Sequence, residues 1–302
     1  MVKYLFLGIT YILFSDTFIN NKLIFMKVQD KIKKCVAFVA LQLADRSFLS
    51  VGTVFFIIRN SKANKYTYAV TAKHVIEGIK NKGLDKVIIR LNMKDGTLGI
   101  AETKVTEWIY HNDSNIDIAI LPFQIYETVD HNYYPETWFL SDTIIQENEI
   151  DVGDEIFVTG LFSYHQGKKR NLPIIRIGNI AAMPGEKIQT KMGLIDAYLI
   201  EARSTGGLSG SPVFLNVGLV RRIKGKVLLI GSEDIYHLLG IIHGHFETKE
   251  NQIDLAIEDI TESNKINTGI AIVTPIKNLM DLFEQDAILK LEKDADVKLF
   301  TK

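Results

Sequence analysis

The sequence predicts an all-β protein: two packed six-stranded antiparallel β-barrels followed by a C-terminal α-helix. Short runs of β-branched and aromatic residues recur along the 302 residues and are separated by polar or glycine-rich turns. Long stretches of helical periodicity are almost absent. Frequent short strands with few helices are typical of paired β domains.

The first set of expected strands belongs to an N-terminal barrel at residues 26–140. Asp95-Gly96 gives this set a strong hairpin signal. About six strands are enough to close a small barrel. The expected strands are 36–43, 51–59, 66–72, 86–93, 102–111 and 116–123.

A second set predicts a C-terminal barrel within residues 141–302, after a connection at 124–150. A helix should close the chain, because Thr274 can cap it and Pro275 suits its first turn. Its apolar stripe is Ile276, Leu279, Met280 and Phe283. We expect 221–225 to be a hairpin tip and 247–267 an exposed acidic insertion. The expected strands are 153–162, 174–183, 197–203, 211–216, 226–232, 238–244 and 269–275.

Residues 1–25 form a hydrophobic segment that allows two interpretations. Lys3 followed by the apolar stretch 4–14 is typical of a signal peptide, but a small-x-small cleavage site is missing. Alternatively, Met26 is the true start of the protein. The first interpretation predicts export or membrane association, and the second favours a cytoplasmic protein.

Bulk composition excludes several classes of partner. The net charge of −1 gives no electrostatic basis for binding nucleic acid or a membrane surface. The single cysteine, Cys35, permits no internal disulfide and mildly favours a reducing compartment. Its place in an apolar run predicts a buried structural thiol.

Three segments together indicate chemistry, although each alone has an ordinary structural explanation. They contain His74 after the run YAVTAK, Asp117 at the start of DIAILPF, and Ser209 in the glycine-rich STGGLSGSPVF. A serine hydroxyl needs a neighbouring base, histidine supplies one near neutral pH, and a carboxylate orients the imidazole. Glycines let a loop present backbone N–H groups to a carbonyl oxygen. We therefore expect a nucleophilic triad in the cleft between the barrels.

The segments TAKHV, DIAIL and GLSGSPVF resemble the His, Asp and Ser motifs of trypsin-like (chymotrypsin-fold) serine peptidases. The G-x-S-G-S-P form is similar to a bacterial branch that includes glutamyl endopeptidases. The resemblance covers roughly residues 36–284 and implies a peptidase that needs no metal or organic cofactor. Its partner would be a protein or peptide substrate.

Carried onto this chain, the resemblance implies that Ser209 is the nucleophile, His74 the general base and acid, and Asp117 the orienting carboxylate. The N–H groups of Gly207 and Ser209 would form the oxyanion hole. The strand 238–246 would pair with the substrate backbone through His243, Gly244 and His245.

The same resemblance places Arg203 at the floor of the primary specificity pocket, with Ser204 beside it. A cation there would favour an acidic side chain before the scissile bond. Alternatively, Arg203 points away and pairs elsewhere.

Other interpretations stay open at this point. Asp113 competes with Asp117 for the carboxylate role, but it lies in a turn-like HNDSN segment. His243 and His245 could share a strand face as metal ligands, although a third ligand has no evident source. The chain could also be an inactive protease-fold binding or scaffold protein. A nucleotide site at STGG is disfavoured because no Gly-Lys-Ser/Thr follows.

Overall fold

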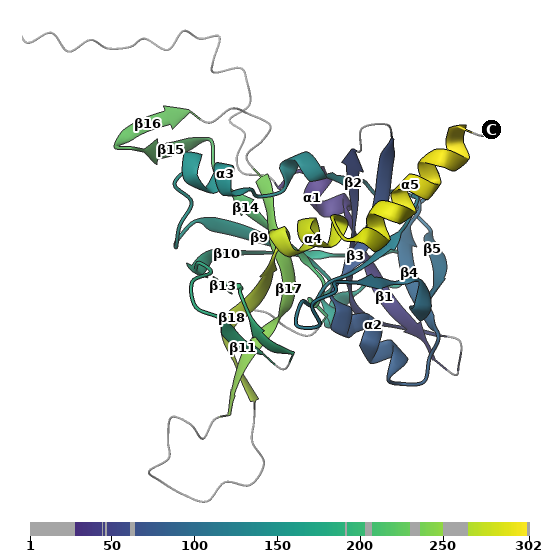
Figure 1. The fold of residues 1–302 in the computed structure, drawn as a ribbon. Helices are drawn as coiled ribbons and strands as arrows, with labels where there is room; N and C mark the ends of the chain where they lie inside the picture. The colour runs from purple at the N-terminus through teal and green to yellow at the C-terminus, as the bar shows by residue number, and fades with distance from the viewer. Residues whose placement is uncertain are drawn as a thin grey trace, which may run out of the picture.

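The computed structural model describes residues 28–43, 45, 47–60, 64–190, 192–202, 207–229, 236–249 and 265–300. Two β-rich halves lie side by side (Figure 1): an eight-stranded sheet and a closed six-stranded barrel, followed by C-terminal helices. The expected all-β class with paired β domains and a terminal helix is confirmed.

Within its described residues, the first half contains four helical segments and eight strands, up to the connection between the halves. In chain order these are α1 (Asp30–Lys34), β1 (Val36–Gln42), β2 (Phe48–Asn60), β3 (Lys65–Thr71), α2 (Lys73–Lys80), β4 (Lys86–Asn92), β5 (Leu98–Lys104), η2 (Val105–Glu107), β6 (Ile109–Tyr110), β7 (Ala119–Pro122), β8 (Tyr134–Pro135) and η3 (Glu136–Trp138).

The second half begins with a short helix and ends with two. Its elements are α3 (Asp142–Glu147), β9 (Glu155–Gly160), η4 (Ser163–His165), β10 (Ile174–Ala182), β11 (Ile188–Thr190), β12 (Gly193–Ile195), β13 (Tyr198–Glu201), β14 (Pro212–Asn216), β15 (Val220–Ile223), β16 (Lys226–Leu229), β17 (Tyr236–Lys249), β18 (Lys265–Pro275), α4 (Ile276–Phe283) and α5 (Asp286–Phe300).

The sheet of the first half follows the order β5-β4-β1-β2-β3-β7-β6, with β8 parallel to β2. Its pairing path begins at β5 and ends at β6, so it is a half-barrel with more strands than expected. The strand expected at 102–111 is broken by η2. There Glu107 accepts a hydrogen bond from the N–H of Lys104 (2.7 Å), and the buried Trp108 donates to Thr103 (3.2 Å). These local bonds turn the chain out of the strand.

The second half is a closed barrel in the order β10-β13-β18-β17-β14-β9. Two hairpins, β11–β12 and β15–β16, lie outside this barrel. The tip of the second hairpin is Lys224-Gly225, within the segment 221–225 where a tip was expected, although 221–223 belong to β15. Lys224 and Gly225 have φ of 49° and 77°. Two consecutive positive φ values are typical of tight hairpin turns.

Alternation along β2 divides its side chains between two cores. Val54 and Phe56 are buried inside the first half. Phe55 and Ile57 belong to a larger core that also includes residues of the second half, such as Phe157. Because successive side chains of a strand point to opposite faces, one face of β2 is directed at the second half.

Helix α2 was not predicted from the sequence, because the segment around His74 was interpreted as a strand that ends directly before the histidine. The helix starts one residue before His74 and buries Val75, Ile76 and Ile79 against the first half. Its apolar residues have the i, i+1, i+4 spacing of one helix face, which eight residues show only weakly.

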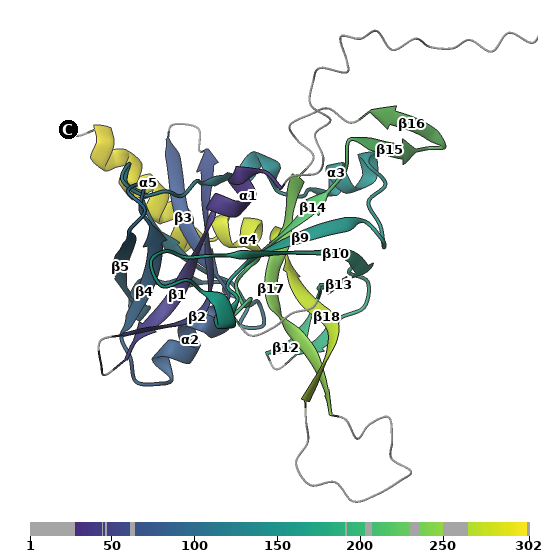
Figure 2. The ribbon, with the colours of Figure 1, turned by 180° about the vertical axis from the view of Figure 1, so that it is seen from behind.

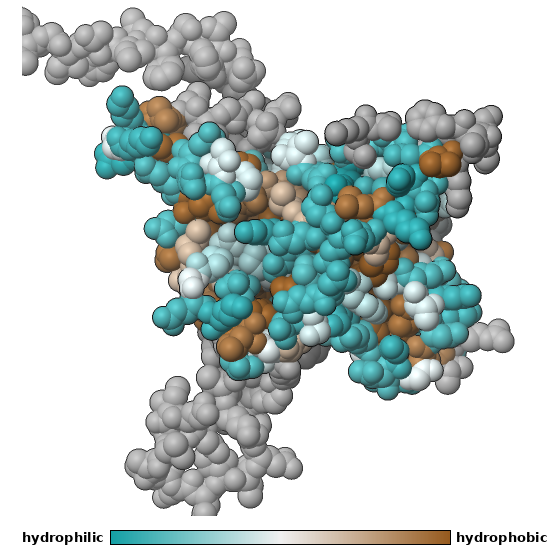
Figure 3. Space-filling view, viewed as in Figure 1, coloured by the Kyte–Doolittle hydropathy of each residue, from teal (hydrophilic) through white to brown (hydrophobic). Residues whose placement is uncertain are grey.

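The C-terminal region forms two helices rather than one. Helix α4 starts directly after Pro275, and it buries Leu279 while Met280 is 38% exposed. Helix α5 is tied down by Glu292, which is buried, accepts from Tyr68 Oη (2.8 Å) and lies 3.6 Å from Arg59. On the face seen in Figure 3, hydrophilic residues predominate over both helices. Their outer sides therefore face water.

Several expectations fall outside the described residues: the segment 1–25, Arg203, Ser204 and most of the insertion 247–267. Strand β17 extends to Lys249 and β18 begins at Lys265. Among the helices of the described ranges, none is both long and apolar enough to cross a membrane.

The packing of α4 gives a stability prediction. Leu279→Ala should lower the free energy of unfolding by about 2–5 kcal/mol, because Leu279 is fully buried. Met280→Ala, on the exposed side of the same helix, is the control and should change it by less than about 1 kcal/mol. Urea unfolding followed by circular dichroism measures both, and equal effects would contradict this packing of α4.

Candidate active site

A buried carboxylate joins the start of α2 to the strand β7. Asp117 has a fully buried side chain and accepts two hydrogen bonds from His74. The backbone N–H donates to Oδ1 (2.8 Å), and ring Nδ1 lies 2.6 Å from Oδ2. The two bonds fix both the position and the orientation of the imidazole. The side chain of His74 is 38% exposed, so the edge of its ring away from Asp117 is accessible.

A second imidazole reaches the same oxygen from the other half of the molecule. Nδ1 of His243 lies 2.9 Å from Oδ2 of Asp117, and the ring centroids of His243 and His74 are 6.0 Å apart. His243 sits at a bulge of β17, where the register with β18 shifts between Ile242 and Gly244. A bulge re-aims a side chain. The ring is thus directed at Asp117, a contact that strand alternation alone does not predict.

These contacts stabilise the ionised form of Asp117. Burial pushes the pKa of the carboxyl up, but the contacts with His243 and then His74 outweigh it and hold the pKa well below its usual range. The carboxyl of Asp117 is therefore ionised at neutral pH. A charge in this place favours the N–H form of Nδ1 in His74, which leaves Nε2 free to accept a proton.

The turn containing Ser209 docks on the first half beside α2. The carbonyl of Ser209 accepts a hydrogen bond from the N–H of Thr53 in β2 (2.9 Å). A Cβ added to Gly52 would lie 2.9 Å from the side chain of Val75 and 3.3 Å from the Ser209 carbonyl. A Cβ added to Gly210 would collide with Thr71 and Thr53. The serine turn and the beginning of α2 thus meet over β2.

Backbone N–H groups of the serine turn indicate a candidate binding site for an anion. Gly207 has a φ of 101°, a conformation that other residues rarely adopt. The N–H groups of Gly207 and Ser209 make no hydrogen bond to any residue that the structure describes, whereas those of Gly210 and Ser211 bond to Ile242 and Leu208. Two unpaired donors in one tight turn can stabilise a developing negative charge.

One edge of β17 ends without a strand partner. Pairing with β14 stops at Ile241, opposite Pro212, while pairing with β18 continues to Lys249. From His243 onward, the edge away from β18 is unpaired among the described strands. Such an edge can accept an extended peptide as an added strand.

Other expected residues are placed less fully. Asp113 is exposed, and its carboxylate accepts from the N–H of Asn115 within its own turn, away from the imidazole of His74. The side chain of His245, like Arg203 and Ser204, lies outside the described residues. Among the described side chains, no group of three His, Cys, Asp or Glu could hold a metal ion.

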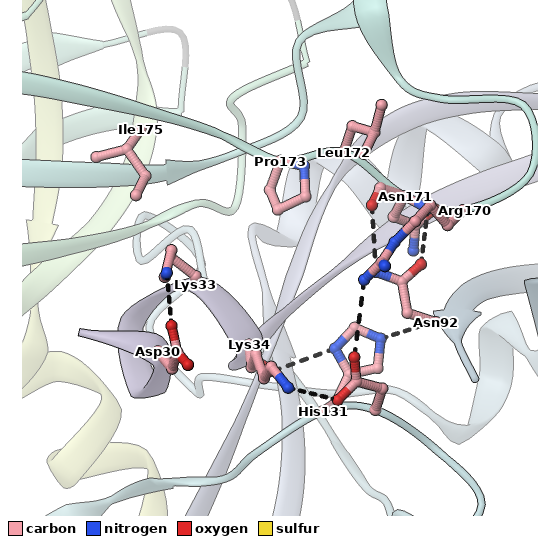
Figure 4. Close-up of a pocket in the computed structure, with 11 residues that line it drawn as sticks. Asp30, Lys33, Lys34, Asn92, His131, Arg170, Asn171, Leu172, Pro173 and Ile175 are labelled. Carbon is pink, nitrogen blue, oxygen red and sulfur yellow. Dashed lines mark hydrogen bonds and ion pairs between the residues drawn. The ribbon is translucent and has the colours of Figure 1, made fainter. Parts of the chain in front are cut away.

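A cavity of about 310 Å³, lined mostly by polar residues, lies elsewhere (Figure 4). It is found where the segment before β10 crosses to the first half, a crossing that Figure 2 shows. Its cations already have partners: Lys33 pairs with Asp30, and Asp130 is shared by Lys34 and Arg170. The charged groups around the cavity therefore have a structural role, and the Arg170–Asp130 pair links the two halves.

His131, which lines this cavity, is neutral. Burial lowers the pKa of His131 to about 4. Its Nε2 accepts from the N–H of Asn92 (2.9 Å), so Nδ1 carries the proton and donates to the carbonyl of Lys34 (3.1 Å). Asn92 and Asn171 in turn bond to each other through 2.7 and 3.1 Å contacts.

The charge of Asp117 makes stability depend on pH. Since its folded pKa is lower than the unfolded value of about 3.9, its stabilising effect is present above about pH 4 and is lost as pH falls toward the folded pKa. Asp117→Asn should cost about 1–3 kcal/mol near pH 7, and the difference from wild type should shrink below about pH 4. Thermal unfolding from pH 7 to pH 2.5 measures this.

Asp113→Asn is the matched control, because its carboxyl is exposed in a turn. It should leave the pH profile of unfolding nearly unchanged. A pH-independent gap between Asp117→Asn and wild type would show that the carboxyl is not held ionised.

No family model and no curated protein matches the chain. Solved structures similar to it include the apo MamO protease domain from Magnetospirillum magneticum, at 12% identity and a TM-score of 0.49 over 85% of this chain and 98% of that one. The active form of the Rv3671c protease from M. tuberculosis is 18% identical, with a TM-score of 0.43 over 84% and 81% of the two chains. An inactive mutant form of Rv3671c is 17% identical, with a TM-score of 0.41 over 83% and 87%.

Proposed function

We propose that this chain is a serine endopeptidase in which Ser209, His74 and Asp117 form the catalytic triad. One observation carries the proposal: the imidazole of His74 is held by the buried Asp117, and the Ser209 turn docks beside the helix that bears this imidazole. Acyl transfer needs a base with a fixed tautomer and a serine on a nearby turn whose N–H groups can bind an oxyanion. The His74–Asp117 contact, the docking of the Ser209 turn, and N–H groups of that turn without a partner among the described residues support this arrangement.

In this mechanism His74 Nε2 takes the proton of Ser209 as the hydroxyl oxygen attacks the scissile carbonyl carbon. The negative charge on the carbonyl oxygen is stabilised by the N–H groups of Gly207 and Ser209. His74 then gives its proton to the leaving amine, and the acyl-enzyme forms. Water, deprotonated by His74, releases the acid product. Asp117 stabilises the imidazolium throughout without taking the proton.

Substrate binding is proposed at the free edge of β17. Main-chain groups from His243 to His245 would bond to an extended peptide next to Ser209. The side chain of His243 is committed to Asp117 at 2.9 Å, so it contributes to the site through the carboxylate. Its backbone remains at the unpaired edge and can still serve the substrate.

The triad prediction is tested with a fluorophosphonate probe, which labels activated serines. Ser209→Ala should abolish labelling and lower kcat on casein or a peptide library by at least about 10³-fold, because the nucleophile is lost. Ser47→Ala, an exposed serine of the first half, is the control and should behave as wild type. Hydrolysis that survives in Ser209→Ala would refute the assignment.

An acidic preference before the scissile bond is the finer proposal, and it depends on Arg203. Profiling with a peptide library should show Glu or Asp favoured at this position by wild type. Arg203→Gln should lower that preference about tenfold while cleavage after neutral residues is retained. A preference that is the same in both proteins would remove Arg203 from the pocket.

A protease-fold binding or scaffold protein is the alternative function. It predicts no reaction of wild type with the probe and full retention of partner binding in Ser209→Ala. The first proposal predicts reaction, so the labelling experiment separates the two.

A further inference from the structure

Thr53 lies on β2 at the point where this strand faces the serine turn. Its side chain is fully buried. It shares the strand face of Phe55 and Ile57, which belong to the core common to both halves. Alternation along β2 therefore directs the hydroxyl of Thr53 out of the first half and toward the second.

The hydroxyl of Thr53 uses its full hydrogen-bonding capacity. Oγ1 accepts from the N–H of Leu161 (2.9 Å) and from the hydroxyl of Ser211 (3.0 Å), and it donates to the carbonyl of Gly207 (3.2 Å). A threonine hydroxyl has one proton and two acceptor positions. All three partners belong to the second half. The hydroxyl of this first-half residue is therefore hydrogen-bonded entirely by the second half.

The backbone of Thr53 adds two more bonds at the same point. Its N–H donates to the carbonyl of Ser209 (2.9 Å), and its carbonyl accepts from the hydroxyl of Thr71 (2.6 Å). Thr71 is three residues before His74. The bonds of Thr53 thus reach Gly207, Ser209 and Ser211 on one side and the approach to the histidine on the other.

The turn that Thr53 holds has an unusual backbone. Gly207 and Gly210 have φ of 101° and 80°. Gly160 packs against the same hydroxyls, since a Cβ there would collide with Ser211 and lie 2.7 Å from Thr53 Oγ1. A short glycine-containing turn has several accessible conformations, so bonds from outside are needed to keep one of them.

We propose that Thr53 is a positioning residue whose hydroxyl fixes the carbonyl of Gly207 and thereby keeps the N–H groups of Gly207 and Ser209 directed at the substrate oxygen. This inference rests on the proposed peptidase function and deepens it. Among the described residues, none of the hydrogen bonds of Thr53 goes to a triad side chain. It acts through the turn, from the opposite half of the molecule.

The test compares a substitution that removes the hydroxyl with one that keeps it. Thr53→Val is isosteric but lacks the hydroxyl, and it should lower kcat about 10²-fold with little change in KM, since an oxyanion donor acts mainly in the transition state. Thr53→Ser keeps the hydroxyl and should stay within a few-fold of wild type. Affinity for a peptide aldehyde should fall with kcat in Thr53→Val.

Thr159→Val is the matched control. Thr159 is also fully buried in a strand, but its hydroxyl has no hydrogen-bond partner among the described residues. Its kcat should equal that of wild type. If Thr53→Val does not fold, Thr53→Ala and Thr53→Ser, which differ by the one hydroxyl, carry the same comparison.

Amide hydrogen exchange separates this inference from the proposed function. Exchange of the Gly210 and Ser211 amides should become at least about tenfold faster in Thr53→Val and stay near wild type in Thr53→Ser. Unchanged exchange and unchanged kcat in Thr53→Val would overturn the positioning role, as would equal loss in both variants. A wild type that does not react with the probe would instead refute the peptidase function, and the exchange result would still decide the role of Thr53.

Discussion

Hydrogen bonds between β2 and the turn at residues 207–211 are the constraint on which the site depends. The histidine and the carboxylate come from one half of the molecule and the serine from the other, so neither half contains the site alone. Thr53 bonds to Gly207, Ser209 and Ser211, and this brings the serine turn to the beginning of α2. A broad apolar core common to both halves gives these bonds a rigid base.

The site also depends on the carboxylate of Asp117, which is ionised although it is buried. An isolated carboxylate would be neutral there, because burial disfavours the ionised form. Asp117 stays ionised since His74 contacts both of its oxygens and His243 contacts one. The two histidines come from different halves, so the carboxylate is itself part of the junction. Electrostatics and packing thus depend on the same docking of the halves.

Much of the strand pattern could be predicted from the sequence, because strands and turns leave local signals. Runs of β-branched and aromatic residues predicted β2 and β7, and Lys224-Gly225 lies in the segment where a hairpin tip was expected. The pattern failed where an element is short or where side-chain bonds interrupt a strand. Helix α2 is too short to show a clear period, and the break between β5 and β6 depends on bonds of Glu107 and Trp108.

The candidate site, too, could be predicted only in part from the sequence. Motif spacing indicated His74 and Asp117, and the structure places these side chains in contact. Motif spacing could not indicate that His243 faces Asp117, because a bulge in β17 decides this. Nor could it indicate that Thr53 bonds to the serine turn, because the docking of the two halves decides that. No motif records such contacts.

A crystal structure of the protein after reaction with a peptidyl phosphonate tests the central claim most directly. The account predicts phosphorus bonded to the Ser209 oxygen, a phosphoryl oxygen within hydrogen-bond distance of the N–H groups of Gly207 and Ser209, and Nε2 of His74 about 3 Å from the serine oxygen. A label on another residue, or a Ser209 oxygen well outside contact with His74, would contradict it.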